Sequence, residues 1–131
     1  MTAPLTVDVT GWLITRLAAA LTATVDSETP GDTVGNSSWV PFVRVVRIGG
    51  PNDGYILDIP TVAFHCFAAS QQAANQLGYT VISTVNALRG AVHDGAVITR
   101  TATLSGPSWA AVENQNLRHT VVLMQIRIKT A

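Results

Sequence analysis

Residues 57–90 read LDIPTVAFHCFAASQQAANQLGYTVISTVNALRG and predict a strand followed directly by one long helix. Side chains alternate along residues 61–67 with the two-residue period of an extended segment. Ser70 is a typical N-cap and Gly90 a typical helix stop. Between them, apolar residues recur at helical spacing: Ala74, Leu77, Val81, Val85 and Leu88. Such an apolar stripe needs a sheet to pack against, so we expect the flanking strands to form one.

The composition indicates one small domain with an unusually uncharged surface. Of the 131 residues, 47% are hydrophobic and 12% are charged. An average soluble domain has about 25% charged residues. The length fits a single domain over residues 1–131 with a real hydrophobic core. Because neutral or apolar surface of this extent usually marks contact with other protein, we expect an oligomer or a larger assembly.

Charge balance and cysteine content exclude several classes of function. Eight basic and eight acidic residues cancel, so no net positive field favours sequence-specific DNA binding or an anionic membrane. The single cysteine, Cys66, cannot form an internal disulfide and fits a reducing compartment. The apolar stretch 12–25 follows Asp8 rather than positive charge, contains Arg16 and is too short to span a bilayer. We therefore expect a cytoplasmic protein that makes no membrane contact.

Patterns on either side of the central strand and helix predict the remaining elements. Asp8 or Thr6 caps a first amphipathic helix, and a Gly- and Asn-rich turn joins the first two strands. Pro60 lacks an N–H, so we expect its part of the second strand at a sheet edge or a bulge. The predicted elements are, in chain order, a helix at 9–21, a polar loop at 26–38, strands at 39–48 and 55–67, the central helix, a strand at 96–104, a loop at 105–116 and a strand at 117–129.

The order α-β-β-α-β-β predicts an α+β fold. We expect a mainly antiparallel four-stranded sheet with both helices packed on one face. Alternation along the last strand assigns its two faces. The face expected against the helices carries Thr120, Val122, Met124, Ile126 and Ile128, and the outward face carries Val121, Leu123, Gln125 and Arg127.

No constellation of residues predicts catalysis, a cofactor or a metal. The only soft metal ligands are Cys66 and the histidines at 65, 93 and 119, and they lack the close paired spacing of a zinc site. A buried structural role is expected for Cys66, and a surface or interface role for His119. Turns and caps explain the carboxylates, and the Gly49-Gly50 pair precedes a strand rather than a helix, unlike a phosphate-binding loop. We expect no enzyme activity.

Two tryptophans and the outward face of the last strand are the candidate interface. Trp39 and Trp109 each border or interrupt a polar loop, where a large aromatic residue is either a binding anchor or a ring folded back on the core. Both interpretations stay open for each residue. Val121 and Leu123 are aliphatic residues on a face that a monomer would expose, and Arg127 lies beside them. These five residues are the expected subunit or partner interface.

Several short motifs together resemble the tail terminator, or tail completion, proteins of long-tailed bacteriophages, most closely those of actinobacterial phages. The resemblance covers most of the chain. It is carried by Trp12-Leu13 in the helix at 9–21, Pro41-Phe42-Val43, Arg47-Ile48-Gly49-Gly50-Pro51, Asp58-Ile59-Pro60-Thr61-Val62, the helix between Phe67-Ala68 and Leu88-Arg89-Gly90, and Gly106-Pro107 before the final strand. The loop at 26–38 matches no feature of that family.

The resemblance implies a structural virion protein without cofactors. Its members form a ring, usually of six copies, that caps the finished tail tube, ends tail growth and offers a docking surface to the head connector. DNA passes through the lumen of the ring. The implied partners are further copies of the chain, the tail tube protein and a head–tail connector or head-closure protein. The implied location is the head-proximal end of the virion tail, after assembly in the host cytoplasm.

Two other classes of protein remain as alternatives. A head–tail connector or head-closure subunit is the nearest one, because such proteins have a similar size. A small cytoplasmic α+β enzyme or ligand-binding domain belongs to a different class. A deep pocket with convergent polar groups would favour the enzyme or binding domain, and a flat self-associating surface would favour the structural protein.

Overall fold

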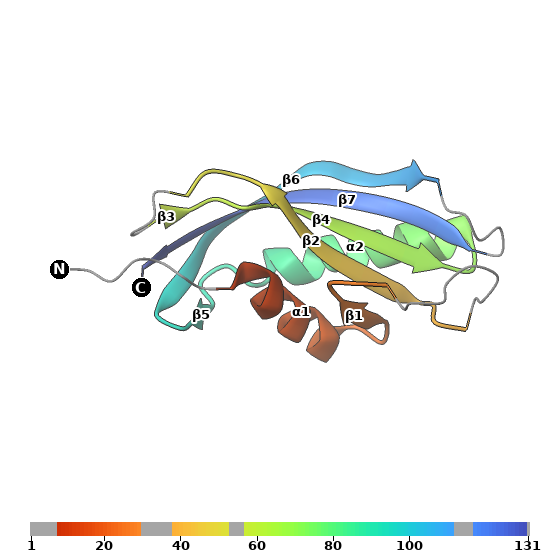
Figure 1. Cartoon of the computed structure of the whole chain (residues 1–131), viewed down its shortest axis with the longest axis horizontal. Helices are drawn as coiled ribbons and strands as arrows, with labels where there is room; N and C mark the ends of the chain where they lie inside the picture. Colours follow the sequence, from red (N-terminus) through yellow and green to blue (C-terminus); the bar gives the residue numbers. More distant parts are fainter. Residues whose placement is uncertain (1–7, 30–37, 53–56, 112–116, 131) are drawn as a thin grey trace.

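The computed structural model describes residues 8–29, 38–52, 57–111 and 117–130 (Figure 1). These ranges form a seven-stranded sheet and two helices. The elements are α1 (Val9–Ala20), β1 (Thr24–Asp26), β2 (Phe42–Gly49), β3 (Leu57–Asp58), β4 (Thr61–Ala68), α2 (Gln71–Asn86), β5 (Val92–His93), β6 (Ala96–Ala110) and β7 (Arg118–Thr130).

The sheet is mixed, curled and larger than the sequence predicts. Its strands lie in the order β1-β2-β4-β7-β6-β5, and β3 also pairs with β7. The β1–β2 pair is parallel and the other pairs are antiparallel. Long strands bend over the helices to give a half-barrel shape (Figure 1). The predicted four-stranded antiparallel sheet is therefore wrong, although two helices and a roughly α+β composition are present.

Short strands account for the difference in strand number. β1 ends at Asp26, the first residue of the predicted polar loop, and its three residues pair in parallel with the first residues of β2. Ile59 and Pro60 interrupt the predicted second strand and divide it into β3 and β4. β5 adds a two-residue pairing with β6. Strands of two or three residues are too short to produce a readable period.

The predicted loop at 105–116 is wrong over residues 105–110, because β6 continues to Ala110. Its pairing with β7 shifts register at three places, including the step from Ser105 to Ser108 that spans Gly106 and Pro107. A bulge of this kind lets a strand pass a proline without needing its missing N–H. The rest of that loop, like most of the loop predicted at 26–38, lies outside the described residues.

Both helices begin at the predicted caps. The Asp8 carboxylate accepts a hydrogen bond from the Gly11 N–H at 3.1 Å, and the Ser70 hydroxyl accepts one from the Ala73 N–H at 3.1 Å. Each cap satisfies a backbone donor that has no partner within its helix. α2 ends at Asn86 rather than at Gly90, since a turn occupies the residues between them.

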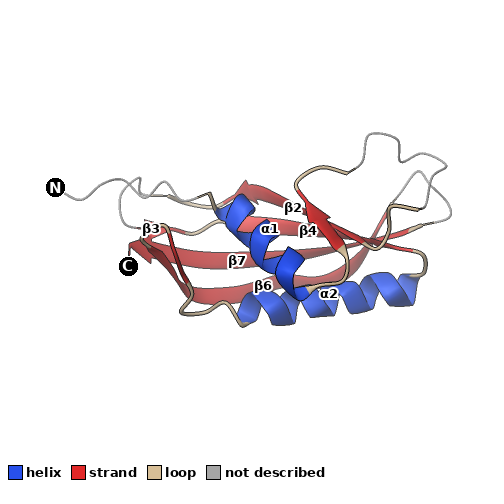
Figure 2. Cartoon of the chain, turned by 90° about the horizontal axis from the view of Figure 1, so that it is seen from below, coloured by secondary structure: helices blue, strands red, loops and turns tan. Residues whose placement is uncertain are grey.

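The core fills the space between the two helices and the inner face of the sheet (Figure 2). α1 supplies Trp12, Leu13 and Leu17, and α2 supplies Val81 and Val85. These side chains pack into one buried cluster with alternate residues of the long strands: Val43, Val45, Val62, Phe64, Cys66, Ile98, Val122, Met124, Ile126 and Ile128. The inward assignment made for the last strand is confirmed, because all five of its predicted residues are buried.

Gly78 allows α2 to approach the sheet closely. A Cβ at this position would lie 3.0 Å from Pro107 Cγ and 3.1 Å from Val122 Cγ2. Both distances are shorter than ordinary van der Waals contact between carbon atoms. The helix therefore rests directly on β6 and β7 at its midpoint.

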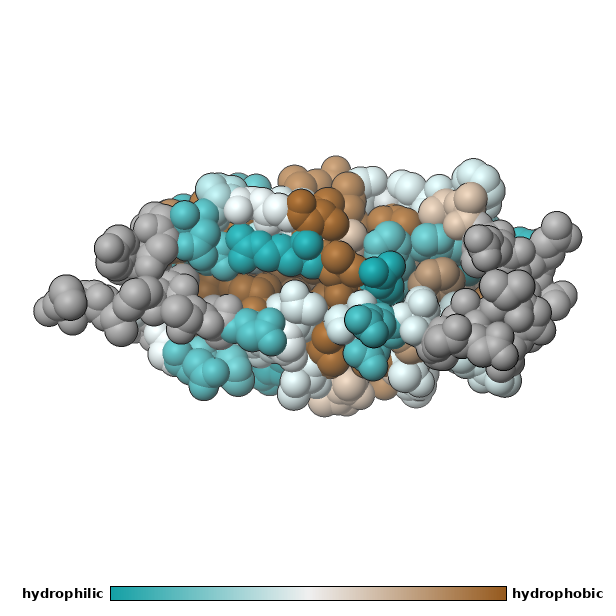
Figure 3. Space-filling view, in the orientation of Figure 1, coloured by the Kyte–Doolittle hydropathy of each residue, from teal (hydrophilic) through white to brown (hydrophobic). Residues whose placement is uncertain are grey.

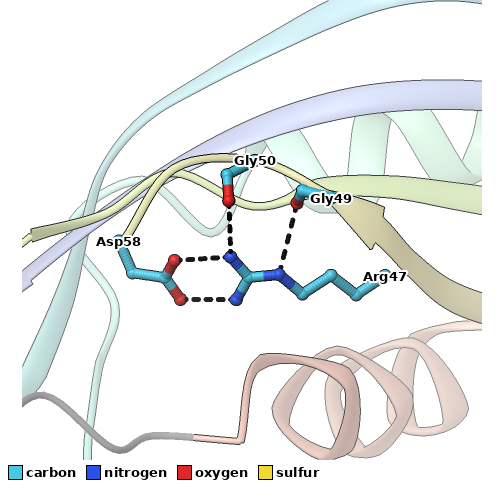
Figure 4. A network of polar contacts seen from close by, with 4 residues as sticks. All are labelled: Arg47, Gly49, Gly50 and Asp58. Atoms are coloured by element: carbon cyan, nitrogen blue, oxygen red, sulfur yellow. Dashed lines mark hydrogen bonds and ion pairs between the residues drawn. The ribbon is translucent and has the colours of Figure 1, made fainter. Parts of the chain in front are cut away.

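A partly buried ion pair links Arg47 near the end of β2 to Asp58 of β3 (Figure 4). The Arg47 guanidinium donates two hydrogen bonds of 2.8 Å to the Asp58 carboxylate, whose side chain is 3% exposed. It donates two more, each 3.2 Å, to the carbonyl oxygens of Gly49 and Gly50. Gly50 has φ +103°, and a Cβ there would clash with the Ile59 carbonyl. Arg47 thus binds both the backbone at the end of β2 and the Asp58 side chain of β3.

Replacing Arg47 with Met is expected to lower the free energy of unfolding by about 3 kcal/mol, because it leaves the Asp58 carboxylate buried and unpaired. The double variant Arg47→Met/Asp58→Leu removes both charges, so it is expected to recover most of that loss. Urea titration followed by circular dichroism measures both. Equal destabilisation in the single and double variants would show that the ion pair is not the cause.

Candidate functional site

The side of the sheet opposite the helices is the candidate functional site. We call it the outer face and define it by the residues of β2, β4, β6 and β7 that alternate with the buried inner set. Register places Val46 beside Ala63, and Ala63 beside Leu123. No helix in the described part of the chain covers this side (Figure 2). The sheet therefore has one face packed by the core and one face that no described helix covers.

The centre of the outer face is apolar. Val46, Val121 and Leu123 are half-buried, and Ala63 is buried among its strand neighbours. At the rim, Ile48 is 56% exposed and Leu104 is 54% exposed. Figure 3 shows hydrophobic surface at the middle of the upper margin of that view, over the end of β2, with more hydrophilic surface on either side. Exposed apolar area of this kind is typical of a protein contact.

The structure brings three of the five predicted interface residues together. Val121, Leu123 and Arg127 lie along the outer face of β7, as alternation predicts, and Arg127 is exposed. Trp109 lies in β6 and is 71% exposed, so it is not folded back on the core. Trp39 is half-buried against two aromatic residues of the outer face: its ring is centred 5.6 Å from that of Phe42 and 5.1 Å from that of Phe67. It is therefore not part of the core cluster.

A histidine pair on the outer face was not predicted. His65 of β4 and His119 of β7 lie diagonally across the strand pair, with His65 Nδ1 2.9 Å from His119 Nε2. His119 Nδ1 lies 3.0 Å from the Ala111 carbonyl, which only accepts, so this nitrogen carries a proton. The other ring nitrogen of His119, Nε2, shares the hydrogen bond with Nδ1 of His65. The Phe67 ring stacks on His119 with centroids 4.4 Å apart.

Protonation of His65 is unfavourable in this setting. Burial, then the charge of His119 and that of Arg44, lowers the pKa of His65 to about 4. The ring is therefore neutral at pH 7 and serves as a packed hydrogen-bonding group. Burial also raises the pKa of the Cys66 thiol to about 12, so this cysteine is an inert core residue, as expected.

The lowered pKa of His65 predicts that acid destabilises the fold. Between about pH 6.5 and pH 4 the unfolded chain binds a proton at His65 that the folded chain does not, so stability falls as pH falls through this window. His65→Gln is expected to give a shallower loss over the same window. Thermal melts at half-unit pH intervals measure it. An unchanged pH dependence in the variant would show that other groups cause the acid sensitivity.

Two pockets are lined by residues of β7, one together with β6 and one together with β3. The first has a volume of about 250 Å³ and is lined by Ile59, Arg100, Ala102, Gln125 and Arg127. The second has a volume of about 270 Å³ and is lined by Leu57, Arg127, Lys129 and Thr130. Both fall below the usual 300–1,000 Å³ range of small-molecule sites, and neither contains a carboxylate, a cysteine or a histidine among these residues.

The described residues contain no group of three or more His, Cys, Asp or Glu side chains arranged to hold a metal ion. His93, the third histidine, stacks on Trp12 with ring centroids 5.2 Å apart. None of the helices in these ranges is long and apolar enough to cross a lipid bilayer. The sequence matches no protein-family model and no curated protein.

Adjacent residues of β7 test whether the outer face is an interface. Leu123→Asp places a charge on the outer face, so it is expected to block self-association at a cost of several kcal/mol while sparing the monomer fold. Met124→Asp places the same charge in the core, where the native side chain is 0% exposed, and is expected to unfold the monomer. Circular-dichroism melts and analytical ultracentrifugation of both variants measure this.

Each alternative has its own outcome. If Leu123→Asp melts as early as Met124→Asp, both faces of β7 are intramolecular core. If Leu123→Asp melts and associates like the wild type, the outer face contacts only solvent.

Proposed function

We propose that this chain is the subunit of a bacteriophage tail-terminator ring. In this role it caps the tail tube, ends tail growth and provides the docking surface for the head connector. It acts as a structural protein without enzyme activity. The observation that carries the proposal is the outer face, which no helix in the described ranges covers and which is apolar at its centre in a chain with few charges.

Burial energetics support self-association through this face. Val46, Val121 and Leu123 retain exposed apolar area in the monomer, and removing such area from water stabilises a contact by about 25 cal/mol per Å². A contact between different surfaces of identical subunits closes into a ring when the rotation between neighbours allows it. Few charged groups then need to be desolvated at the interface.

Two of the sequence motifs shared with tail terminator proteins meet in space, which supports the resemblance. Arg47, Gly49 and Gly50 belong to one motif and Asp58 to another, and all four form a single network (Figure 4). Residues that look like separate short matches in the sequence thus have one structural role. By this resemblance, six copies form the ring, which contacts the tail tube and a connector protein, and DNA crosses its lumen.

Deleting the gene for this chain from its phage is expected to yield tails of irregular length that fail to join filled heads, because nothing caps the growing tube. Negative-stain electron microscopy of the lysate measures tail length and the fraction of joined particles. Supplying the wild-type chain from a plasmid is the matched control and should restore joined virions.

Two outcomes contradict the proposal. Tails of normal length on filled heads would show that the chain has no part in tail completion. Tails of normal length beside heads that lose their DNA would instead indicate a head-closure subunit.

A further inference from the structure

Two arginines lie directly opposite each other on the outer face. Arg100 of β6 and Arg127 of β7 are partners in the register of the two strands. Opposed residues on neighbouring strands have Cβ atoms about 5 Å apart, and like charges in this position are destabilising. Lys129 continues the row along β7. Within the described ranges, the guanidinium groups of Arg100 and Arg127 make no hydrogen bond or ion pair.

The pair lines a concave site rather than an open surface. Both arginines, the Gln125 amide and the apolar side chains of Ile59 and Ala102 line the pocket of about 250 Å³. Gln125 lies two residues from Arg127 on the same face of β7. Two guanidinium forks and an amide supply convergent donors, and the apolar side chains reduce competition from water.

Arg47, an arginine that stabilises the fold, has a different environment. Its charge is neutralised by the buried Asp58 carboxylate, and two backbone carbonyls accept hydrogen bonds from it. Arg100 and Arg127 have no such neutralisation among the described residues. Like charges placed opposite each other on neighbouring strands tend to cost stability, so the fold gives no reason for this pair and we look for one in what the pocket binds.

We propose that this pocket receives a carboxylate side chain from a second copy of the chain, an inference that rests on the ring of the proposed function. A carboxylate matches the bidentate donor geometry of arginine. A zero net charge gives no long-range attraction toward DNA, which makes a phosphate backbone the weaker candidate. The size of the pocket also fits one side chain better than a continuous strand.

Glu28 is the carboxylate that the topology favours. It follows β1, which is the edge strand at the opposite end of the sheet order from β6 and β5. It is exposed and makes no hydrogen bond or ion pair in the described part of the chain. The pocket lies toward one end of the sheet order and Glu28 lies at the other, so head-to-tail contacts between identical subunits pair opposite charges and steer neighbours into one orientation.

A charge-exchange experiment tests the contact. Arg100→Glu/Arg127→Glu keeps two like charges opposed but reverses their sign, and Glu28→Lys reverses the other partner. Each variant alone is expected to self-associate at least about tenfold more weakly than the wild type. An equimolar mixture is expected to recover association, since every contact in an alternating ring then joins opposite charges. Mass photometry of the full chain over a concentration series measures all four samples.

A second measurement separates binding from folding. Arg127→Gln removes the like-charge repulsion, so the monomer is expected to melt roughly 2 °C higher at low salt while associating more weakly. Arg16→Gln, at an exposed position of α1, is the matched control and should change neither quantity. A lower melting temperature for Arg127→Gln would contradict the repulsion that the inference requires.

The remaining outcomes are decisive. Three results would each overturn the contact. The wild-type chain could stay monomeric, the Arg100→Glu/Arg127→Glu variant could associate normally, or the equimolar mixture could fail to recover association. If the Arg100→Glu/Arg127→Glu variant self-associates normally but its particles no longer retain DNA, the pocket binds phosphate instead. Recovery in the mixture together with normal tails in the deletion lysate would retain the contact and reject the tail-terminator function.

Discussion

The pairing of β4 with β7 is the constraint on which the rest of the structure depends. Eight consecutive residue pairs, from Thr61–Gln125 to Ala68–Arg118, hold these two strands in one antiparallel register. This register puts Phe64 and Val122 together on the inner face, and it puts Ala63 and Leu123 together on the outer face. A slip by one residue would exchange the two faces of either strand and expose the core. The helices pack where they do because only the inner face offers them a continuous apolar surface.

The same register creates the features of the outer face that no local segment contains. His65 meets His119 only because β4 and β7 are neighbours at that point, although 54 residues separate them in the chain. Arg100 opposes Arg127 only because the register of β6 shifts after Ile98. A bulge in one strand therefore decides which charges face each other across the sheet. The chemistry of the candidate site is set by strand pairing rather than by motifs.

This dependence explains what could be predicted from the sequence. The caps at Asp8 and Ser70, the start of α2 and the two faces of β7 follow from local periodicity, so they were predictable. β1, β3 and β5 contain two or three residues each and carry no period, so the predicted four strands became seven. Gly106 and Pro107 read as a loop, because a sequence pattern does not show that a bulge lets a strand continue past them. Val121, Leu123 and Arg127 were found by alternation, whereas the histidine and arginine pairs depend on contacts between distant strands.

The few charged residues of the chain are arranged differently on the inner and outer faces of the sheet. On the inner side, Asp58 is the one buried acid among the described residues, and Arg47 neutralises it. On the outer side, apolar residues occupy the middle. Among the described residues, Arg100 and Arg127 lie without an ion pair toward the β6–β7 end, and Arg44 lies toward the β1–β2 end, where its Nε donates to the Ser27 carbonyl. An apolar centre supplies affinity without direction, because the hydrophobic effect depends on area and not on orientation. Localised charge supplies direction, since it penalises every alignment that places like charges together. A sheet face with both features can bind one partner in one orientation, which is what a closed ring demands of each of its subunits.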